Sequence, residues 1–164
     1  MSSERLWSPA FINYGVSSGI FYMTQYVLVA ALPIILTAEL GGTALDAGLA
    51  MTYFQIGTIL CRPFAGRLID GLDKRIILLI SSVLFFIIMG LFNLTTSLQT
   101  IFVLRGVHGA IFALGTTVMA ALAVVVLPAS RKGEGINMFA VFSNIAMVSG
   151  PAVGLYTLQA YGSS

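Results

Sequence analysis

The stretch Gly66-Arg67-Leu68-Ile69-Asp70-Gly71-Leu72-Asp73-Lys74-Arg75 places five charged residues between two strongly apolar segments. Charged side chains are costly in the hydrocarbon core of a bilayer, and positive residues gather in the loops at its cytoplasmic surface. We therefore expect this stretch to be a short loop between two membrane-spanning helices.

The composition of the whole chain is typical of a membrane protein. Charged residues make up 9% of the 164 residues and hydrophobic residues 58%, and the mean hydropathy is +0.98. A soluble domain carries about 25% charged residues. The formal net charge of +2 is too small to indicate nucleic-acid binding. Cys61 is the single cysteine, so we expect a small helix-packing residue rather than a disulfide, metal or redox site.

The sequence lacks the patterns that enzymes and ATP-driven pumps require. It has no glycine-rich phosphate loop, no metal-ligand cluster and no nucleophile triad. We therefore expect neither an enzyme nor an ATP-driven pump, and no cofactor or metal.

Five segments are long and apolar enough to cross a bilayer, which takes about 20 mostly apolar residues. They cover residues 11–36, 47–66, 75–94, 100–127 and 137–160. Short links join them, so the sequence predicts an all-α membrane protein. Small residues four positions apart let helices approach closely in lipid. Such pairs are Gly15 and Gly19, Gly57 and Cys61, and Gly150 and Gly154.

Positive residues fall almost entirely on one side of the expected membrane. The set on the N-terminal side is Arg5, Arg62, Arg67, Lys74, Arg75, Arg131 and Lys132, and only Arg105 is left over. Because Lys and Arg are enriched in cytoplasmic loops, we expect a cytoplasmic N-terminus. After five spans, residue 164 is then expected on the outer face.

The spacing G-x-L-x-D-x-x-x-[KR]-[KR] within 66–75 resembles motif A of the major facilitator superfamily of secondary transporters. In that family the loop acts as a conformational latch, in which the Asp contacts the opposite half of the transporter. The resemblance assigns this role to Gly66, Asp70, Lys74 and Arg75. Two positions depart from the pattern, since Gly71 replaces a basic residue and Asp73 replaces a glycine. The alternative interpretation is an ordinary positive loop.

Arg105 and Gly109 in the fourth span are similar to motif B of the same family, whose Arg is linked to proton or substrate coupling. His108 occupies a position that the family often fills with Gln, and it shares a helix face with Arg105. Alternatively, Arg105 is about five residues, or roughly 7.5 Å, from the start of the span, so it can extend its charge outward. For His108 we prefer the interpretation of a hydrogen-bonded packing residue.

Gly150, Pro151 and Gly154 in the fifth span are similar to the G-P-x-x-G core of motif C, which the family associates with antiporters that export drugs or metabolites. The motif is expected to bend the helix, because Pro lacks a backbone N–H donor, while the glycines allow a neighbouring helix to pack closely. Leu155 departs from the motif, where a further glycine is usual. A generic Gly-Pro kink is the alternative.

The first span is unusually polar along one face. Tyr14, Ser18, Tyr22 and Gln25 follow at i, i+4, i+8 and i+11, and we expect them to line a cavity, although they can also make ordinary helix contacts. No Asp or Glu lies deep in any span. Because intramembrane carboxylates are the usual proton carriers, proton coupling would depend on Arg105 and His108 or on groups in a further half.

The resemblance implies a major facilitator bundle, with residues 1–164 forming five helices of an N-terminal six-helix half. It implies secondary active efflux of small drugs or metabolites by alternating access, coupled to protons, in the plasma (inner) membrane. The partners would be the bilayer, a small-molecule substrate, protons and a C-terminal half. The alternative is a truncated or split-gene chain without transport of its own, which pairs with a separate second half. A small self-assembling multidrug carrier predicts a shorter chain with an intramembrane Glu, and neither is found.

Overall fold

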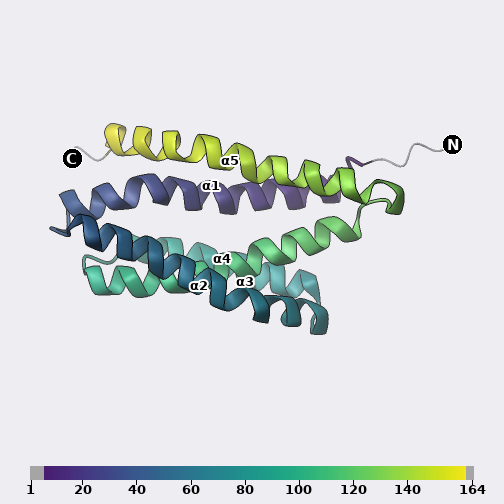
Figure 1. Cartoon of the computed structure of the whole chain (residues 1–164), viewed down its shortest axis with the longest axis horizontal. Coiled ribbons are helices and arrows are strands. Elements are labelled where there is room, and N and C mark those ends of the chain that lie inside the picture. Colours follow the sequence, from purple (N-terminus) through teal and green to yellow (C-terminus); the bar gives the residue numbers. More distant parts are fainter. Residues whose placement is uncertain (1–5, 162–164) are drawn as a thin grey trace.

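The computed structural model describes residues 6–161 and has the expected all-α architecture (Figure 1). Arg5, one of the predicted cytoplasmic cations, lies outside the described residues. The helices are α1 (Pro9–Ala38), α2 (Ala44–Gly71), α3 (Lys74–Phe92), α4 (Leu98–Val125) and α5 (Lys132–Tyr161), and a short 3-10 turn, η1 (Ala129–Arg131), precedes α5. All five α-helices are long and apolar enough to span a membrane. The predicted fold class is thereby confirmed.

The charged stretch at 66–75 is mostly helical rather than a loop, so its predicted extent was wrong. Helix α2 continues to Gly71 and α3 begins at Lys74, which leaves a link of two residues. The carboxylate of Asp73 caps α3 by accepting a hydrogen bond from the backbone N–H of Arg75 at 2.7 Å. A helix can continue from the bilayer into water, because its backbone groups are hydrogen-bonded to one another in both environments.

The link between α1 and α2 makes a sharp turn that the sequence marks clearly. Gly41 has a φ of +65°, a conformation that side-chain-bearing residues rarely adopt. Two residues later, Thr43 forms a capping box with Asp46, in which the Thr43 backbone N–H donates to the Asp46 carboxylate at 2.7 Å. The turn and the cap together fix where α2 begins.

Helices α2 and α4 touch backbone to backbone. A Cβ on Gly57 would collide with the carbonyl group of Gly106, and a Cβ on Gly109 would collide with that of Phe54. The hydroxyl of Thr58 adds a shared hydrogen bond across this contact, since its hydrogen lies between the carbonyl oxygen of Phe54 in its own helix at 2.9 Å and that of Gly109 at 3.2 Å. Close approach at small residues is how helices associate in lipid, where no hydrophobic driving force exists.

Helices α1 and α5 form a second close pair. A Cβ on Gly150 would lie 2.5 Å from the Cβ of Tyr26, and one on Gly154 would lie 2.7 Å from the carbonyl oxygen of Val27. At the other end of the pair, Gly15 faces the ring of Phe142. The glycines of the motif C resemblance thus hold α5 against α1.

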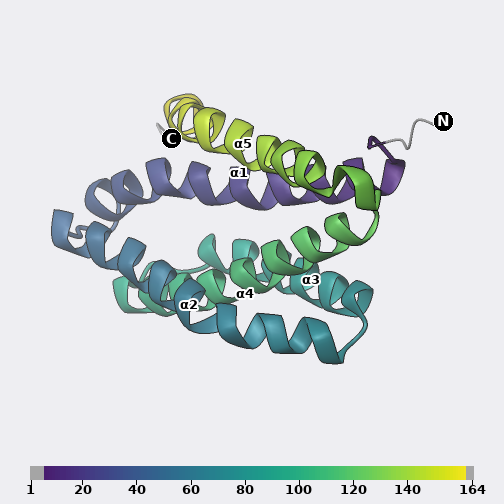
Figure 2. The same ribbon diagram turned by 45° about the vertical axis from the view of Figure 1, so that its right-hand side comes forward.

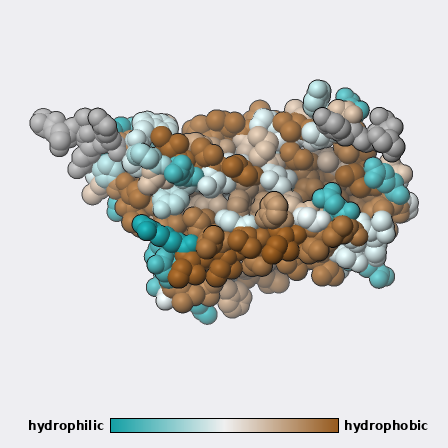
Figure 3. All heavy atoms as spheres, turned by 180° about the vertical axis from the view of Figure 1, so that it is seen from behind, coloured by the Kyte–Doolittle hydropathy of each residue, from teal (hydrophilic) through white to brown (hydrophobic). Residues whose placement is uncertain are grey.

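The two pairs form two layers of the bundle (Figure 2). α1 and α5 make one layer, while α2, α4 and α3, which packs on α4, make the other. The apolar core between them contains Phe21, Phe54, Phe85, Ile88, Phe112 and Met119. The outside is hydrophobic as well: Figure 3 shows a belt of apolar residues along one edge, and Phe86 of α3 is 81% exposed. Such a surface suits contact with lipid.

Candidate functional site

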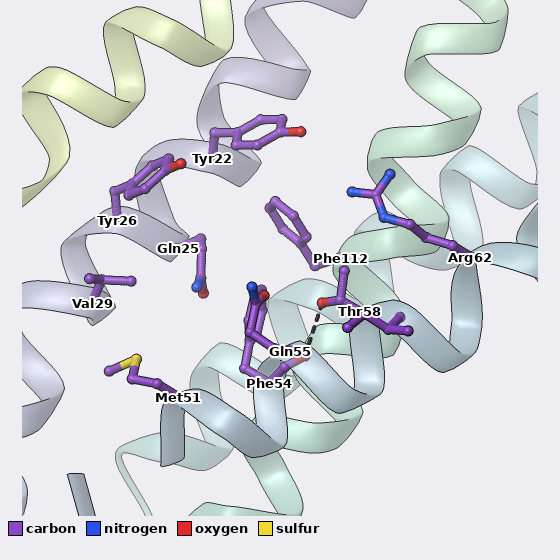
Figure 4. A pocket seen from close by; sticks show the side chains of 11 residues that line it. Tyr22, Gln25, Tyr26, Val29, Met51, Phe54, Gln55, Thr58, Arg62 and Phe112 are labelled. Atoms are coloured by element: carbon purple, nitrogen blue, oxygen red, sulfur yellow. Dashed lines mark hydrogen bonds between the residues drawn. The ribbon is translucent and has the colours of Figure 1, made fainter. Parts of the chain in front are cut away.

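A cavity of about 480 Å³ opens between α1, α2 and α4 (Figure 4). Its wall combines aromatic and polar side chains. The aromatic residues are Tyr22, Tyr26, Phe54 and Phe112, and the polar residues are Gln25, Gln55, Thr58 and Arg62. This volume and this mixture of residues are typical of small-molecule sites, where an apolar wall carries a few polar groups that fix orientation.

A second cavity of about 330 Å³ adjoins the first and extends toward α5. The two share Tyr22 and Arg62 as lining residues. Hydroxyl groups from three helices line the second cavity, namely Ser18 of α1, Thr116 and Thr117 of α4, and Ser143 of α5. We refer to these two adjoining cavities, which lie between the α1–α5 pair and the α2–α4 pair, as the hollow.

The structure places three of the four predicted α1 residues at this hollow. Ser18 lines the smaller cavity, Gln25 the larger and Tyr22 both. Tyr14 packs against two apolar clusters of the bundle, beside Phe11 and Ile77. The spacing alone could not distinguish Tyr14 from the other three residues. Residues on the same helix face contact different neighbours at different heights along the helix.

Arg105 lies behind the wall of the larger cavity and is completely buried. Its Nη1 donates to Oε1 of Gln25 at 3.1 Å, its Nε donates to the carbonyl oxygen of Ala50 at 3.4 Å, and its Nη2 approaches the sulfur of Met51 at 3.3 Å. The guanidinium carbon also lies 4.6 Å from the ring centre of Phe54. The side chain therefore points into the bundle and does not reach outward to the membrane surface. None of these contacts is with a carboxylate.

His108 completes this cluster. Its Nδ1 lies 3.1 Å from Nη1 of Arg105. Arginine has donors only, so Nδ1 accepts and the neutral ring carries its proton on Nε2. Among the described residues Nε2 has no hydrogen-bond partner, and the ring packs edge-on against Phe54, Phe85 and Phe92 at 5.0, 5.2 and 6.0 Å between centroids. His108 thus orients the guanidinium from inside an aromatic box.

The residues of the motif A resemblance lie together at one end of α2 and α3. Asp70 is exposed, and nothing stands within 4 Å of the Cβ position of Gly66. Gly66 therefore makes no close approach to another helix within residues 6–161. Lys74 and Arg75 form the first turn of α3. Pro151, from the motif C resemblance, lies inside the unbroken helix α5.

Arg62 is a cavity residue that the sequence analysis missed, because it was interpreted as one of the cytoplasmic cations. A signal was present. Gln55, Thr58 and Arg62 follow at i, i+3 and i+7 in an otherwise apolar segment, the spacing of one helix face. All three line the larger cavity.

An apolar helical bundle that encloses a polar-lined hollow beside a buried arginine has the features of a membrane transporter domain. Residues 14–164 match the Major Facilitator Superfamily, and the chain belongs to this family of membrane transporters. Within the described residues, no group of three or more potential metal ligands occurs.

Two curated relatives are similar to the chain, one named for drug resistance and the other for export. Over 128 residues the chain is 25% identical to the quinolone resistance protein NorA of Staphylococcus aureus (strain MRSA252), a match that covers 78% of this chain and 33% of that protein. Over 162 residues it is 27% identical to the staphylopine export protein of Staphylococcus aureus (strain Mu50 / ATCC 700699), covering 95% of this chain and 39% of that protein. The chain thus spans a third to two fifths of the length of these relatives.

Proposed function

We propose that this chain forms one half of a secondary active transporter that exports small amphipathic molecules by alternating access. The observation that carries the proposal is the hollow between the two helix pairs, whose aromatic and polar wall suits such molecules. The similarity to a quinolone resistance protein and to a staphylopine export protein supports the direction of transport.

The other wall of the substrate site would come from a second helical bundle, in the same polypeptide or in a separate one. In this family two halves rock against each other around a site at their interface. The latch residues at the end of α2 and α3 support this proposal, because exposed Asp70 has no hydrogen-bond partner among residues 6–161 and is free to contact another bundle.

For proton coupling, we propose that Arg105 is the responding group and that a carboxylate of the second half carries the proton. Arg105 is positively charged, buried and without a carboxylate partner in the described part of the chain. A carboxylate that approaches it in one conformation and withdraws in the other would bind its proton differently in the two states. His108 would orient Arg105 rather than carry the proton.

The distribution of charge supports one orientation in the plasma membrane. Arg67, Lys74, Arg75 and Lys132 lie at the α2–α3 and α4–α5 links, and Glu39 and Asp46 lie at the opposite ends of α1 and α2. By the positive-inside rule, we propose that the N-terminus is cytoplasmic.

A direct test is export of a fluorescent quinolone from cells that lack their own multidrug pumps. Expression of the intact protein should lower the accumulation of the quinolone in the cells, and a proton uncoupler should restore that accumulation. Unchanged accumulation with the protein present in the membrane would contradict the proposed function.

The second candidate is a chain that has no transport activity alone and pairs with a separately made half. In this candidate, the second helical bundle that completes the substrate site belongs to a separate polypeptide. Membranes can be probed with an antibody to an exposed segment. A band near 17.4 kDa that co-purifies with a complementary bundle would indicate a split transporter, whereas a band more than twice that size would indicate a single polypeptide.

Replacement of Asp70 by asparagine should slow transport and leave the bundle stable. The side chain is exposed and has no hydrogen-bond partner in the described chain, so stability should not change, whereas a latch with the second half would lose its charge. We expect about a tenfold lower efflux rate, equivalent to about 1.4 kcal/mol. Glu39→Gln, at the exposed opposite end of the bundle, is the matched control. Equal efflux by the two variants would argue against the latch.

A further inference from the structure

The hollow has a single formal charge on its wall, and that charge is positive. Arg62 is the only charged side chain among the lining residues of either cavity, and it lines both. It is exposed to the hollow and forms no hydrogen bond or ion pair with residues 6–161. Arg105 lies outside this wall, and each of its three side-chain nitrogens already has an acceptor.

Two hydroxyl groups near Arg62 are also unused. Ser18 lines the same cavity as Arg62, is 1% exposed, and its Oγ has no hydrogen-bond partner in the structure of residues 6–161. Tyr22 lines both cavities, and Figure 4 shows its hydroxyl and the Arg62 guanidinium pointing toward each other across the hollow. Thr116 and Thr117, in contrast, donate their hydroxyl hydrogens to carbonyl groups of their own helix.

A buried hydroxyl without a partner destabilises a fold by about 1–3 kcal/mol, so the free Oγ of Ser18 is costly unless a ligand uses it. Arg62, Tyr22 and Ser18 thus offer three unused donor groups. They match the two oxygens of a carboxylate, which accepts several hydrogen bonds and pairs side-on with a guanidinium. The larger cavity beyond Tyr22 is walled by Tyr26, Met51 and Phe112 and can hold an apolar body.

We propose that Arg62, Tyr22 and Ser18 form a subsite for a carboxylate of the transported molecule, whose aromatic or aliphatic body occupies the larger cavity. The substrates are then amphipathic acids or zwitterions rather than simple cations. This inference rests on the proposed function, since it takes the hollow to be the substrate site.

The test uses two ligands with the same body, 1-naphthylacetate and its neutral amide 1-naphthylacetamide, bound to the intact protein in nanodiscs. The wild-type protein should bind the acid about tenfold more tightly than the amide. Arg62→Gln should weaken only the acid, by about tenfold, and Arg62→Lys should restore part of the difference. Arg67→Gln, an exposed arginine on the same helix that lines neither cavity, should change nothing.

A second variant separates ligand binding from packing. Ser18→Ala removes a hydroxyl that has no partner in the fold, so the midpoint of thermal unfolding should hold or rise while affinity for the acid falls about threefold. A fall in both would mean that Ser18 is structural and would overturn its part in the subsite.

Other outcomes overturn the proposal as a whole. They are a wild-type protein that fails to bind the acid, one that binds acid and amide alike, and an Arg62→Gln variant that loses both ligands equally, as it would if Arg62 paired with the second half. The two proposals fail separately. Export of a quinolone without an Arg62-dependent preference would refute the subsite alone, and preference without export would refute the transport function alone.

Discussion

Replacement of Arg105 by methionine should reduce efflux about 100-fold, which corresponds to about 2.7 kcal/mol. The variant keeps much of the buried volume but removes the charge. It also leaves Oε1 of Gln25, the carbonyl oxygen of Ala50 and Nδ1 of His108 without their donor, and each unpaired buried group costs about 1–3 kcal/mol. Initial efflux rates in energised vesicles, normalised to the amount of protein in the membrane, would measure the effect.

Arg105→Lys and Arg67→Met show whether the loss belongs to the site. Lysine keeps the charge, but its compact ammonium group cannot reproduce the several in-plane hydrogen bonds of the guanidinium. It should therefore recover only a small part of the efflux rate. Arg67 is exposed on α2, and its replacement should leave transport unchanged. Full activity of Arg105→Lys would show that the geometry of the guanidinium is not required.

Replacement of Gly109 by alanine should lower the free energy of unfolding by about 2–3 kcal/mol, in the upper range for overpacked sites. The added Cβ would meet the carbonyl group of Phe54 and would lie 3.0 Å from the backbone nitrogen of Thr58. Backbone atoms held in a helix cannot move aside, so α2 must shift away from α4. The shift would also lengthen the hydrogen bond from Thr58 to the carbonyl oxygen of Gly109, now 3.2 Å. Thermal unfolding in detergent would measure the loss.

Gly90→Ala provides the matched control. Gly90 lies in the last turn of α3 with nothing within 4 Å of its Cβ position, and alanine is a better helix former than glycine. That variant should therefore be as stable as the wild type or more so. If Gly109→Ala were equally well tolerated, the contact between α2 and α4 would have to be looser than the structure describes.

The helices could be predicted because length and hydropathy alone define a membrane span, but the chemistry at their ends could not. Helix α2 runs five residues beyond the predicted end at Gly66, to Gly71, because a change from apolar to charged residues marks the membrane surface and not the end of a helix. Likewise, the start of α3 at Lys74 depends on its capping by Asp73, a local geometry that the charge pattern does not contain.

The site was predictable in kind but not in its contacts. Arg105 was recognised as a costly residue within a span, yet its burial depends on Gln25, 80 positions away on α1, and a one-dimensional pattern does not tell which helices are neighbours. For the same reason Arg62 was taken for a surface cation. The pairing of α2 with α4, which directs Arg62 into the hollow, is determined by glycine contacts between the two backbones.

These glycine contacts also decide how the bundle can deform. Within each helix pair the backbones touch, and each pair therefore moves as a rigid unit. Between the two pairs, α1 contacts α2 and α4 at fewer places, and the hollow is lined by side chains, which can change rotamer far faster than helices can move. The interface between the two pairs is thus the most deformable part of the structure, and substrates of different shape would be accommodated there without a change within either pair.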